Sequence, residues 1–332
     1  MPDATTTDSL SVIIPVFNEE QNLSALHREL MEVLNALAHQ AEIIYVDDGS
    51  RDRSVEIIRS LISNAELSQK IRIRLVRLRR NYGQTTAFMA GIDSSRHSII
   101  VLMDADLQND PRDIPVLLQQ MNEGYDVVSG WRRERKDPFW SKKIPSRLAN
   151  LLISSLSGVR MHDYGCSLKA YRRDCLSGFR LYGEMHRFIP IYAHWQGARI
   201  TEIPVNHRPR QHGQSHYGLS RTFKVLMDLI VVIFLHEYQQ KPMYVFGSAA
   251  LVSFLLSGFS GVWALYYKFF GDKSLIQTPL PLLCVMCFLT AVMCFLMGLL
   301  AELLIRIYYE SQNKLTYAAE SQDTDVSSLQ RN

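Results

Sequence analysis

The stretch Ser98-Ile-Ile-Val-Leu-Met103-Asp104-Ala-Asp106-Leu-Gln108 holds the strongest fold and function signal of this chain. An apolar run long enough for a buried strand is followed directly by two carboxylates that one residue separates. In extended backbone, residues i and i+2 point to the same side, so Asp104 and Asp106 could converge on one cation, and Gln108 adds a neutral oxygen. Oxygen ligands favour Mg2+ or Mn2+, whose coordination substrate phosphates usually complete.

The alternative for this stretch is a solvated acidic turn in front of a helix that Pro111 starts. A D-x-D pair alone occurs often by chance, so the metal interpretation depends on the rest of the chain.

The chain of 332 residues has room for one large or two ordinary domains, and its net charge of +3 is too small to indicate nucleic-acid binding. Residues 1–10 are polar and lack the apolar core of a signal peptide, so we expect the first part of the chain to be cytosolic. The five cysteines are odd in number and scattered, which predicts reduced thiols and neither disulfides nor a zinc site.

Two long segments near the C-terminus carry no charge. They lie between Lys241 and Lys268 and between Lys273 and Glu302, and each exceeds the roughly 20 apolar residues that cross a bilayer as a helix. Buried core helices seldom run so far without a charge, so the sequence predicts two transmembrane helices. Basic residues outside both spans favour cytosolic flanks in an inner (plasma) membrane, although lysines in the short loop weaken that argument.

Apolar runs alternate with helical patterns over the first 130 residues. This alternation predicts an α/β domain with a mostly parallel sheet and helices on both faces. The expected strands cover residues 11–17, 42–46, 72–78, 98–103 and 126–129.

Polar residues follow four of these strands, and ligands of open α/β sheets bind at the carboxyl ends of strands. One such cluster could be helix capping, but four in succession indicate one shared site. There is no G-x-G-x-x-G after the first strand and no phosphate-binding NTPase loop, which disfavours both of those classes. The polar groups are Asn18 and Glu19, Asp47 and Asp48, Asn81 and Gly83, and finally Asp104 and Asp106.

These segments together resemble the GT-A-fold glycosyltransferases of family 2. The resemblance is closer to the polyprenyl-phosphate branch, which includes dolichyl-phosphate mannose synthase, bacterial undecaprenyl-phosphate glucosyltransferases and the aminoarabinose transferase, and it covers residues 10–220. The motifs are Val12-Ile-Ile-Pro-Val-Phe-Asn-Glu19, Val46-Asp-Asp-Gly-Ser50, Asn81-Tyr-Gly83 with Gly91, and Asp104-Ala-Asp-Leu-Gln108.

The resemblance implies a role for each matching residue on the side of the nucleotide-sugar. Asp104, Asp106 and Gln108 would hold the metal and the diphosphate, so that the metal neutralises the charge that develops on the departing nucleoside diphosphate. The nucleotide would be bound by Pro15, Phe17, Asn18 and Glu19, by Asp47 and Asp48 near base and ribose, and by Asn81 and Gly83.

On the acceptor side, the arginines that bind the acceptor phosphate in the family align with Arg132 and Arg147. The planar donors of arginine suit a phosphate, although residues 132–136 could also be a solvated charged loop. Two further blocks match bacterial members, Asp163-Tyr-Gly-Cys-Ser-Leu-Lys169-Ala-Tyr171 and Met185-His-Arg187-Phe-Ile-Pro190.

A family segment R-x-x-G-x-S-K is matched by Arg210, Ser215 and the residues between them, but His216 stands where the family has lysine. Histidine is only partly protonated near neutral pH, so a permanent positive charge there is in doubt. His207, His212 and His216 have no zinc-like spacing, which favours solvated or phosphate-facing histidines.

The resulting domain hypothesis has four parts. Apolar residues at helical spacing after Ser220 predict an amphipathic helix at the membrane surface, or else one packed on the catalytic domain. The parts are a cytosolic GT-A catalytic domain over 1–220, the amphipathic juxtamembrane helix over 221–241, two transmembrane helices over 242–306, and a polar cytosolic tail over 307–332.

The resemblance therefore implies an inverting transferase that moves a sugar from a nucleotide-sugar to a membrane polyprenyl phosphate, and bacterial members of the family suggest UDP-glucose as the donor. The resemblance also implies a homo-oligomer, a tetramer. Transfer from GDP-mannose or a UDP-aminopentose is an alternative. A processive polysaccharide synthase would need a Q-x-x-R-W motif and more spans, and a non-enzymatic nucleotide-sugar-binding membrane protein would be marked by loss of the D-x-D pair, which is present.

Overall fold

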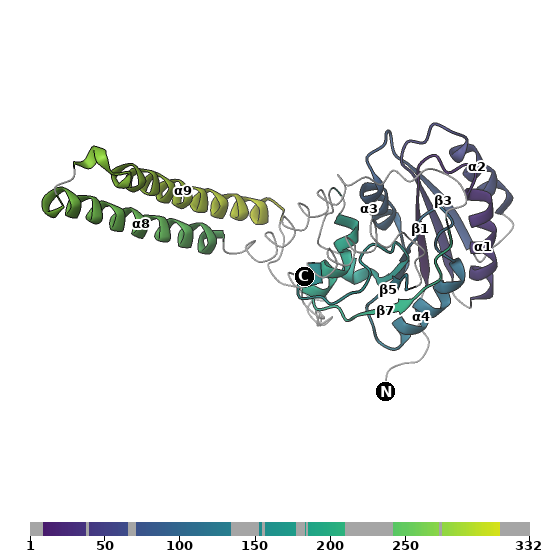
Figure 1. Ribbon diagram of the computed structural model, residues 1–332. Helices are drawn as coiled ribbons and strands as arrows, with labels where there is room; N and C mark the ends of the chain where they lie inside the picture. The colour runs from purple at the N-terminus through teal and green to yellow at the C-terminus, as the bar shows by residue number, and fades with distance from the viewer. Residues whose placement is uncertain are drawn as a thin grey trace, which may run out of the picture. The chain divides into compact units, whose positions relative to one another are not determined.

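The computed structural model has two compact units, Met1–Ile230 and Val231–Asn332. Arg147, Arg210, Ser215 and the predicted helix over 221–241 lie outside the described residues. The structure describes residues 9–37, 40–65, 71–133, 153–154, 157–176, 183, 185–209, 242–271 and 274–312 (Figure 1).

The first unit is built on a seven-stranded sheet with the order β3-β2-β1-β4-β6-β5-β7. Only β6 runs antiparallel to its neighbours, β4 and β5. The predicted mostly parallel α/β sheet is confirmed, and β6 and β7 are additions to it. The strands are β1 (Leu10–Val16), β2 (Ala41–Asp47), β3 (Ile71–Arg77), β4 (Ile99–Leu102), β5 (Val127–Trp131), β6 (Lys169–Arg172) and β7 (Ile200–Pro204).

The central strands are the most apolar ones. Every residue of β2 and β4 is buried, and so is nearly all of β1, as expected for parallel strands that helices cover on both faces. The edge strand β3 instead alternates arginine with apolar residues and is only partly buried. Charged side chains are suitable there because they discourage pairing of the open edge with another strand.

Helices cover both faces of the sheet (Figure 1). On one face, apolar residues of α1 and α4 pack against Val12 and Ile14. On the other face, α3 lies directly on β1, where a Cβ at Gly91 would be only 2.2 Å from Cγ2 of Ile13. The helices are α1 (Leu23–Ala36), α2 (Ser54–Ala65), α3 (Gln84–Ser94), α4 (Ile114–Asn122) and α6 (Ile189–Trp195), with 3-10 turns η1 (Pro111–Asp113), η3 (Arg173–Leu176) and η4 (Met185–Phe188).

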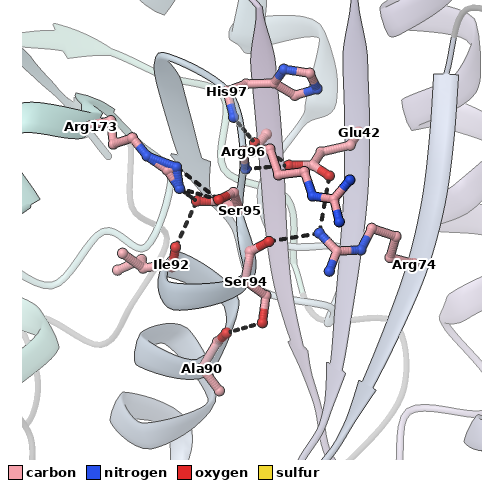
Figure 2. Close-up of polar contacts among 10 residues, drawn as sticks. Glu42, Arg74, Ala90, Ile92, Ser94, Ser95, Arg96, His97 and Arg173 are labelled. Atoms are coloured by element: carbon pink, nitrogen blue, oxygen red, sulfur yellow. Dashed lines mark hydrogen bonds and ion pairs between the residues drawn. The ribbon is translucent and has the colours of Figure 1, made fainter.

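A buried carboxylate, Glu42, ties β1 and β2 together at their amino ends (Figure 2). Its oxygens accept hydrogen bonds from the Ser11 hydroxyl at 2.7 Å, the Arg96 N–H at 2.8 Å and Nη1 of Arg74 at 3.4 Å. Burial alone raises the pKa of Glu42, but these hydrogen bonds and the nearby His97 outweigh it and lower the pKa. The charged carboxylate is therefore the stable form in the folded protein.

Two arginines cap the C-terminus of α3 beside Glu42 (Figure 2). Arg74 donates to the Ser94 carbonyl at 2.6 Å, and Arg173 donates to the Ser95 carbonyl and, at 2.9 Å, to its hydroxyl. Cations are favourable where the last carbonyls of a helix have no helical partner. This contact fixes α3 to the sheet at the end opposite the polar loops.

We expect Glu42→Gln to destabilise the first unit by about 1–3 kcal/mol at neutral pH, because a buried charged acceptor is lost. A carboxylate whose pKa is lowered by folding stabilises the folded state at pH values above its unfolded-state pKa. This stabilisation is lost as the pH falls through the pKa of the folded state. The variant should therefore lose less stability than the wild-type chain upon acidification below about pH 4.3. Unfolding followed by intrinsic fluorescence across pH measures both effects, and parallel wild-type and variant curves would contradict this assignment.

The second unit is a helical hairpin of α8 (Pro242–Phe270) and α9 (Leu280–Gln312), joined through η5 (Leu275–Gln277). Both helices are long and apolar enough to cross a membrane, and only 17% and 11% of their apolar windows are buried within the structure. A core helix of a soluble protein would be mostly buried, so this exposed apolar surface favours a bilayer as its solvent. The helix α9 continues to Gln312, past residue 306 where the second span was predicted to end.

The two helices approach closely where small residues face the partner helix. The Ser257 hydroxyl donates to the Cys284 carbonyl at 2.8 Å, and a Cβ at Gly261 would lie 3.2 Å from Sγ of Cys284. Small residues let membrane helices pack by direct backbone contact. All five cysteines of the chain are free thiols in the structure.

Gly298→Leu should separate the hairpin and lower its melting temperature in detergent. A Cβ at Gly298 would already lie 2.7 Å from Sδ of Met243 and 3.0 Å from Cβ of Phe246. Gly258→Leu is the matched control, since among the described residues no atom outside its own stretch of helix lies within 4 Å of a Cβ at that glycine. Equal melting temperatures for the two variants would contradict the packing described here.

Candidate active site

The loops that follow β1, β2, β3 and β4 surround one pocket of about 230 Å3. The structure thus brings together most of the residues that sequence analysis placed in one site. Of the predicted set within the described residues, Asn18, Asp47 and Gln108 do not line this pocket, and Arg132 lies outside it. The lining residues are Pro15, Val16, Phe17, Glu19, Asp48, Asn81, Gly83, Gln84, Asp104, Ala105 and Asp106.

Asn18 joins the first two loops to each other. Its backbone has φ 57°, in the left-handed region that asparagine tolerates better than most residues. Its side-chain oxygen accepts from the Arg51 N–H at 2.8 Å, and its own N–H donates to the Ser50 hydroxyl at 3.0 Å. Asn18 therefore shapes the pocket wall through the backbone, which explains why the side chain is absent from the lining.

The adjacent carboxylates Asp47 and Asp48 are both buried but have different hydrogen-bond partners. Asp47 accepts from the Ser50 N–H of its own loop at 3.1 Å and forms an ion pair with Nε of Arg77, the last residue of β3, at 3.9 Å. Asp48 accepts from the N–H groups of Tyr82 at 2.7 Å and Gly83 at 2.8 Å, which ties the second loop to the third. Burial raises the pKa of Asp48, and these two N–H groups offset part of that rise.

Gln84, which sequence analysis did not single out, holds the first carboxylate of the D-x-D pair. It is the first residue of α3, directly after Gly83 with φ 96°, and its Nε2 donates to Oδ1 of Asp104 at 2.6 Å. The only sequence signal was its position after the motif Asn81-Tyr-Gly83.

The D-x-D pair lies where the chain enters a bend and not in the extended backbone that the sequence predicted. β4 ends at Leu102, the chain bends over residues 105–107, and Leu107 has φ 60°. Burial, and next the charge of Asp106, raise the pKa of Asp104 to about 6. The two carboxylates therefore lie close enough to repel, and a cation between them would relieve that repulsion.

The residues present fit a hard divalent cation held from one side. Among the residues that the structure describes, no three His, Cys, Asp or Glu side chains gather around a possible metal position. Asp104 and Asp106 can supply two oxygens, which suits Mg2+ or Mn2+ completed by substrate phosphates. The Gln108 N–H donates to Oδ1 of Asp106 at 3.2 Å, so its backbone orients a carboxylate.

Arg132, at the end of β5, is buried in an ion pair and is not part of a solvated loop. Its Nε and Nη2 donate to the two oxygens of Asp163 at 2.7 Å and 2.9 Å, and the arginine side chain is only 14% exposed. Such a two-pronged pair fixes the guanidinium plane. The next residue, Arg133, is exposed and lies over the Trp131 ring.

The segment after β7 braces the loop that follows the D-x-D pair. The backbone of His207 forms an isolated antiparallel bridge with Asn109, so His207 helps to hold the loop that follows the D-x-D pair. Arg208 forms ion pairs with Asp110 at 2.6 Å and with Glu29 of α1 at 2.8 Å. The chain then enters residues 210–241, which lie beyond the described part.

Comparison with known proteins identifies the class of this site. The model of glycosyl transferase family 2 matches residues 11–179. Over 93% of its length the chain is 40% identical to dodecaprenyl-phosphate galacturonate synthase of Rhizobium johnstonii, covering 91% of that protein. It is 37% identical to an undecaprenyl-phosphate 4-deoxy-4-formamido-L-arabinose transferase of Edwardsiella ictaluri, covering 96% of this chain and 95% of that one.

Among solved structures, glucosyl-3-phosphoglycerate synthase from Mycobacterium tuberculosis, in complex with Mn2+, uridine diphosphate and phosphoglyceric acid, is similar with a TM-score of 0.52. The match is 18% identical and covers 69% of this chain and 78% of that chain, so it shows a shared fold. The chain belongs to glycosyltransferase family 2. It is a glycosyltransferase with a GT-A domain, as the resemblance implied.

Replacing Gln84 by leucine should weaken Mn2+ binding about tenfold, because groups that orient a metal ligand typically affect metal affinity by this much. Titration of Mn2+ in the presence of UDP, followed by the electron paramagnetic resonance signal of free Mn2+, measures the change. Gln119→Leu, at an exposed position of α4, is the control. An unchanged affinity in Gln84→Leu would show that Asp104 needs no such support.

Proposed function

We propose that this glycosyltransferase moves a sugar from a nucleoside-diphosphate sugar to a polyprenyl phosphate, with inversion at the anomeric carbon. The observation that carries this proposal is that the D-x-D pair lines the pocket of about 230 Å3 and also lies within reach of the charge of Arg132. Relatives named for dodecaprenyl and undecaprenyl phosphate, which match more than nine tenths of the chain, support the same acceptor class.

The order of the strands in the sheet supports neighbouring sites for the sugar donor and the lipid acceptor. The pocket lies over the loops of β3, β2, β1 and β4, whereas Arg132 follows β5 on the other side of β4. The positive charge of Arg132 nevertheless acts on Asp104, where it offsets part of the rise in pKa that burial and Asp106 cause. A donor with its nucleoside in the pocket and its diphosphate at the D-x-D pair would present its sugar toward Arg132.

The chemistry then needs little acid–base help. A phosphate monoester has a second pKa of about 6, so near neutral pH its oxygen already carries the charge needed for attack. Asp104 and Asp106 would hold a divalent cation, which would neutralise the negative charge that develops on the departing diphosphate. Arg132, fixed by Asp163, would orient the acceptor phosphate in line with the anomeric carbon.

The hairpin of α8 and α9 supports action at a membrane. A polyprenyl chain stays in the bilayer, so the enzyme must be held at its surface. We propose a multi-pass protein of the inner (plasma) membrane with a cytosolic catalytic unit. The tetramer that the resemblance implies stays a prediction.

The donor is the finer part of the proposal. Sequence analysis expected UDP-glucose, whereas the two relatives above are named for galacturonate and 4-deoxy-4-formamido-L-arabinose. Purified full-length chain is incubated with farnesyl phosphate, Mg2+ or Mn2+, and labelled UDP-glucose, UDP-galacturonate, UDP-formamidoarabinose or GDP-mannose. The lipid is then extracted and counted. Labelled lipid with one donor identifies it, and no labelled lipid with any donor would overturn the proposal.

Asp106→Asn should reduce transfer by about a hundredfold or more, because metal stabilisation of the leaving group contributes several kcal/mol. Initial rates of labelled-lipid formation measure the loss. Glu56→Gln, an exposed position of α2, controls for the change of an acid to an amide. Near-normal transfer by Asp106→Asn with a chelator present would exclude a metal role for this carboxylate.

A further inference from the structure

A second arginine, Arg187 of η4, lies beside Arg132 at the acceptor side of the D-x-D pair. A Cβ built on Gly165 would be 3.0 Å from Nη2 of Arg132 and 3.2 Å from Nη1 of Arg187. Both guanidinium groups therefore lie against the same backbone position, close enough to donate to one small anion. The positive charge of Arg187, like that of Arg132, also offsets part of the rise in the pKa of Asp104.

Gly165 leaves the space in which the two guanidinium groups meet. Its N–H donates to Oδ1 of Asp163 at 3.0 Å, and the same carboxylate holds Arg132. A larger residue would push against an arginine that Asp163 keeps from moving away. The glycine therefore permits two like charges to share one small region of the site.

Arg187 is positioned from α3, the helix that also carries Gln84. Oγ1 of Thr85 lies 2.7 Å from Nδ1 of His186 and 2.5 Å from the Gly183 carbonyl. A hydroxyl has one hydrogen and a carbonyl only accepts, so Thr85 donates to Gly183 and accepts from the Nδ1–H of His186. The first turn of α3 thus holds both Asp104, through Gln84, and the turn that carries Arg187.

The position of this pair favours the acceptor over the donor. Arg132, Gly165 and Arg187 are not among the residues that line the pocket, and Arg132 follows β5, which is two strands away from β4 in the sheet. Two of the five N–H donors of Arg132 are already used by Asp163. A phosphate dianion has three terminal oxygens, so a second guanidinium adds donors that Arg132 alone cannot supply.

We propose that Arg187 binds the phosphate monoester of the lipid acceptor together with Arg132, which it approaches beside Gly165, and that the Thr85–His186 contact positions the turn that carries Arg187. This inference rests on the proposed function and adds a substrate-binding residue to it. Lysine would keep the charge of Arg187 but would bind phosphate without the two-pronged geometry.

The test compares Arg187→Gln with the wild-type full-length chain in KM for farnesyl phosphate, kcat and KM for the sugar donor. We expect the acceptor KM to rise about 10- to 100-fold, the range for loss of a charge-assisted hydrogen bond. The donor KM should stay within about twofold. Arg187→Lys should recover part of the loss, and Arg59→Gln, exposed on α2, should behave as wild type.

Thr85→Val tests the positioning contact, because valine keeps the shape and removes the hydroxyl. We expect a smaller rise in acceptor KM than for Arg187→Gln. The double variant should be no worse than Arg187→Gln alone, because both changes act through one guanidinium. Additive effects would show that Thr85 acts elsewhere.

Direct binding separates this inference from the proposed function. Stabilisation of the wild-type chain against heat by farnesyl phosphate, but not by farnesol, should disappear in Arg187→Gln. If that holds while no donor yields labelled lipid, the phosphate site stands and the transferase proposal fails. If transfer occurs and the acceptor KM is unchanged, or the donor KM rises equally, the inference is overturned. Should Arg187→Gln not fold, an unchanged acceptor KM in Arg187→Lys overturns it.

Discussion

The mutual repulsion of Asp104 and Asp106 is the constraint on which the site depends. Both carboxylates follow a buried strand, and burial with this repulsion raises the pKa of Asp104 to about 6. The protein counters it with the amide of Gln84 and with the hydroxyl of Ser167. A divalent cation would complete this compensation, which explains why so many polar groups from distant segments gather at one bend.

The same bend connects the two halves of the proposed reaction. The nucleotide side is built from loops that hydrogen-bond to one another, for example through Asn18 and Asp48. The proposed acceptor side consists of Arg132, Asp163 and the turn that carries Arg187. Helix α3 contacts both the D-x-D pair and that turn, so the groups proposed to bind the two substrates are held by one rigid element. In-line transfer needs such pre-organised groups.

Much of the fold could be predicted because strong local signals agreed with the global arrangement. Continuous apolar runs marked β1, β2 and β4, which are buried on both faces, and polar residues at their ends marked the site. The short strands β6 and β7 gave no such signal. Gln84 was missed because a glutamine after a glycine has many uses, and only its distance to Asp104 reveals this one.

The sequence by itself determined the boundaries of β1 to β5 to within a few residues, the two long apolar segments, the D-x-D pair and the family, because these depend on local periodicity and motif spacing. Only the tertiary structure decided that Asn18 and Asp47 brace loops, that Arg132 is buried against Asp163, and that Arg187 lies beside it. The physical reason is that each of these contacts joins residues far apart in the chain. Their meeting depends on strand order and on turns such as the left-handed Leu107, which residue patterns do not encode.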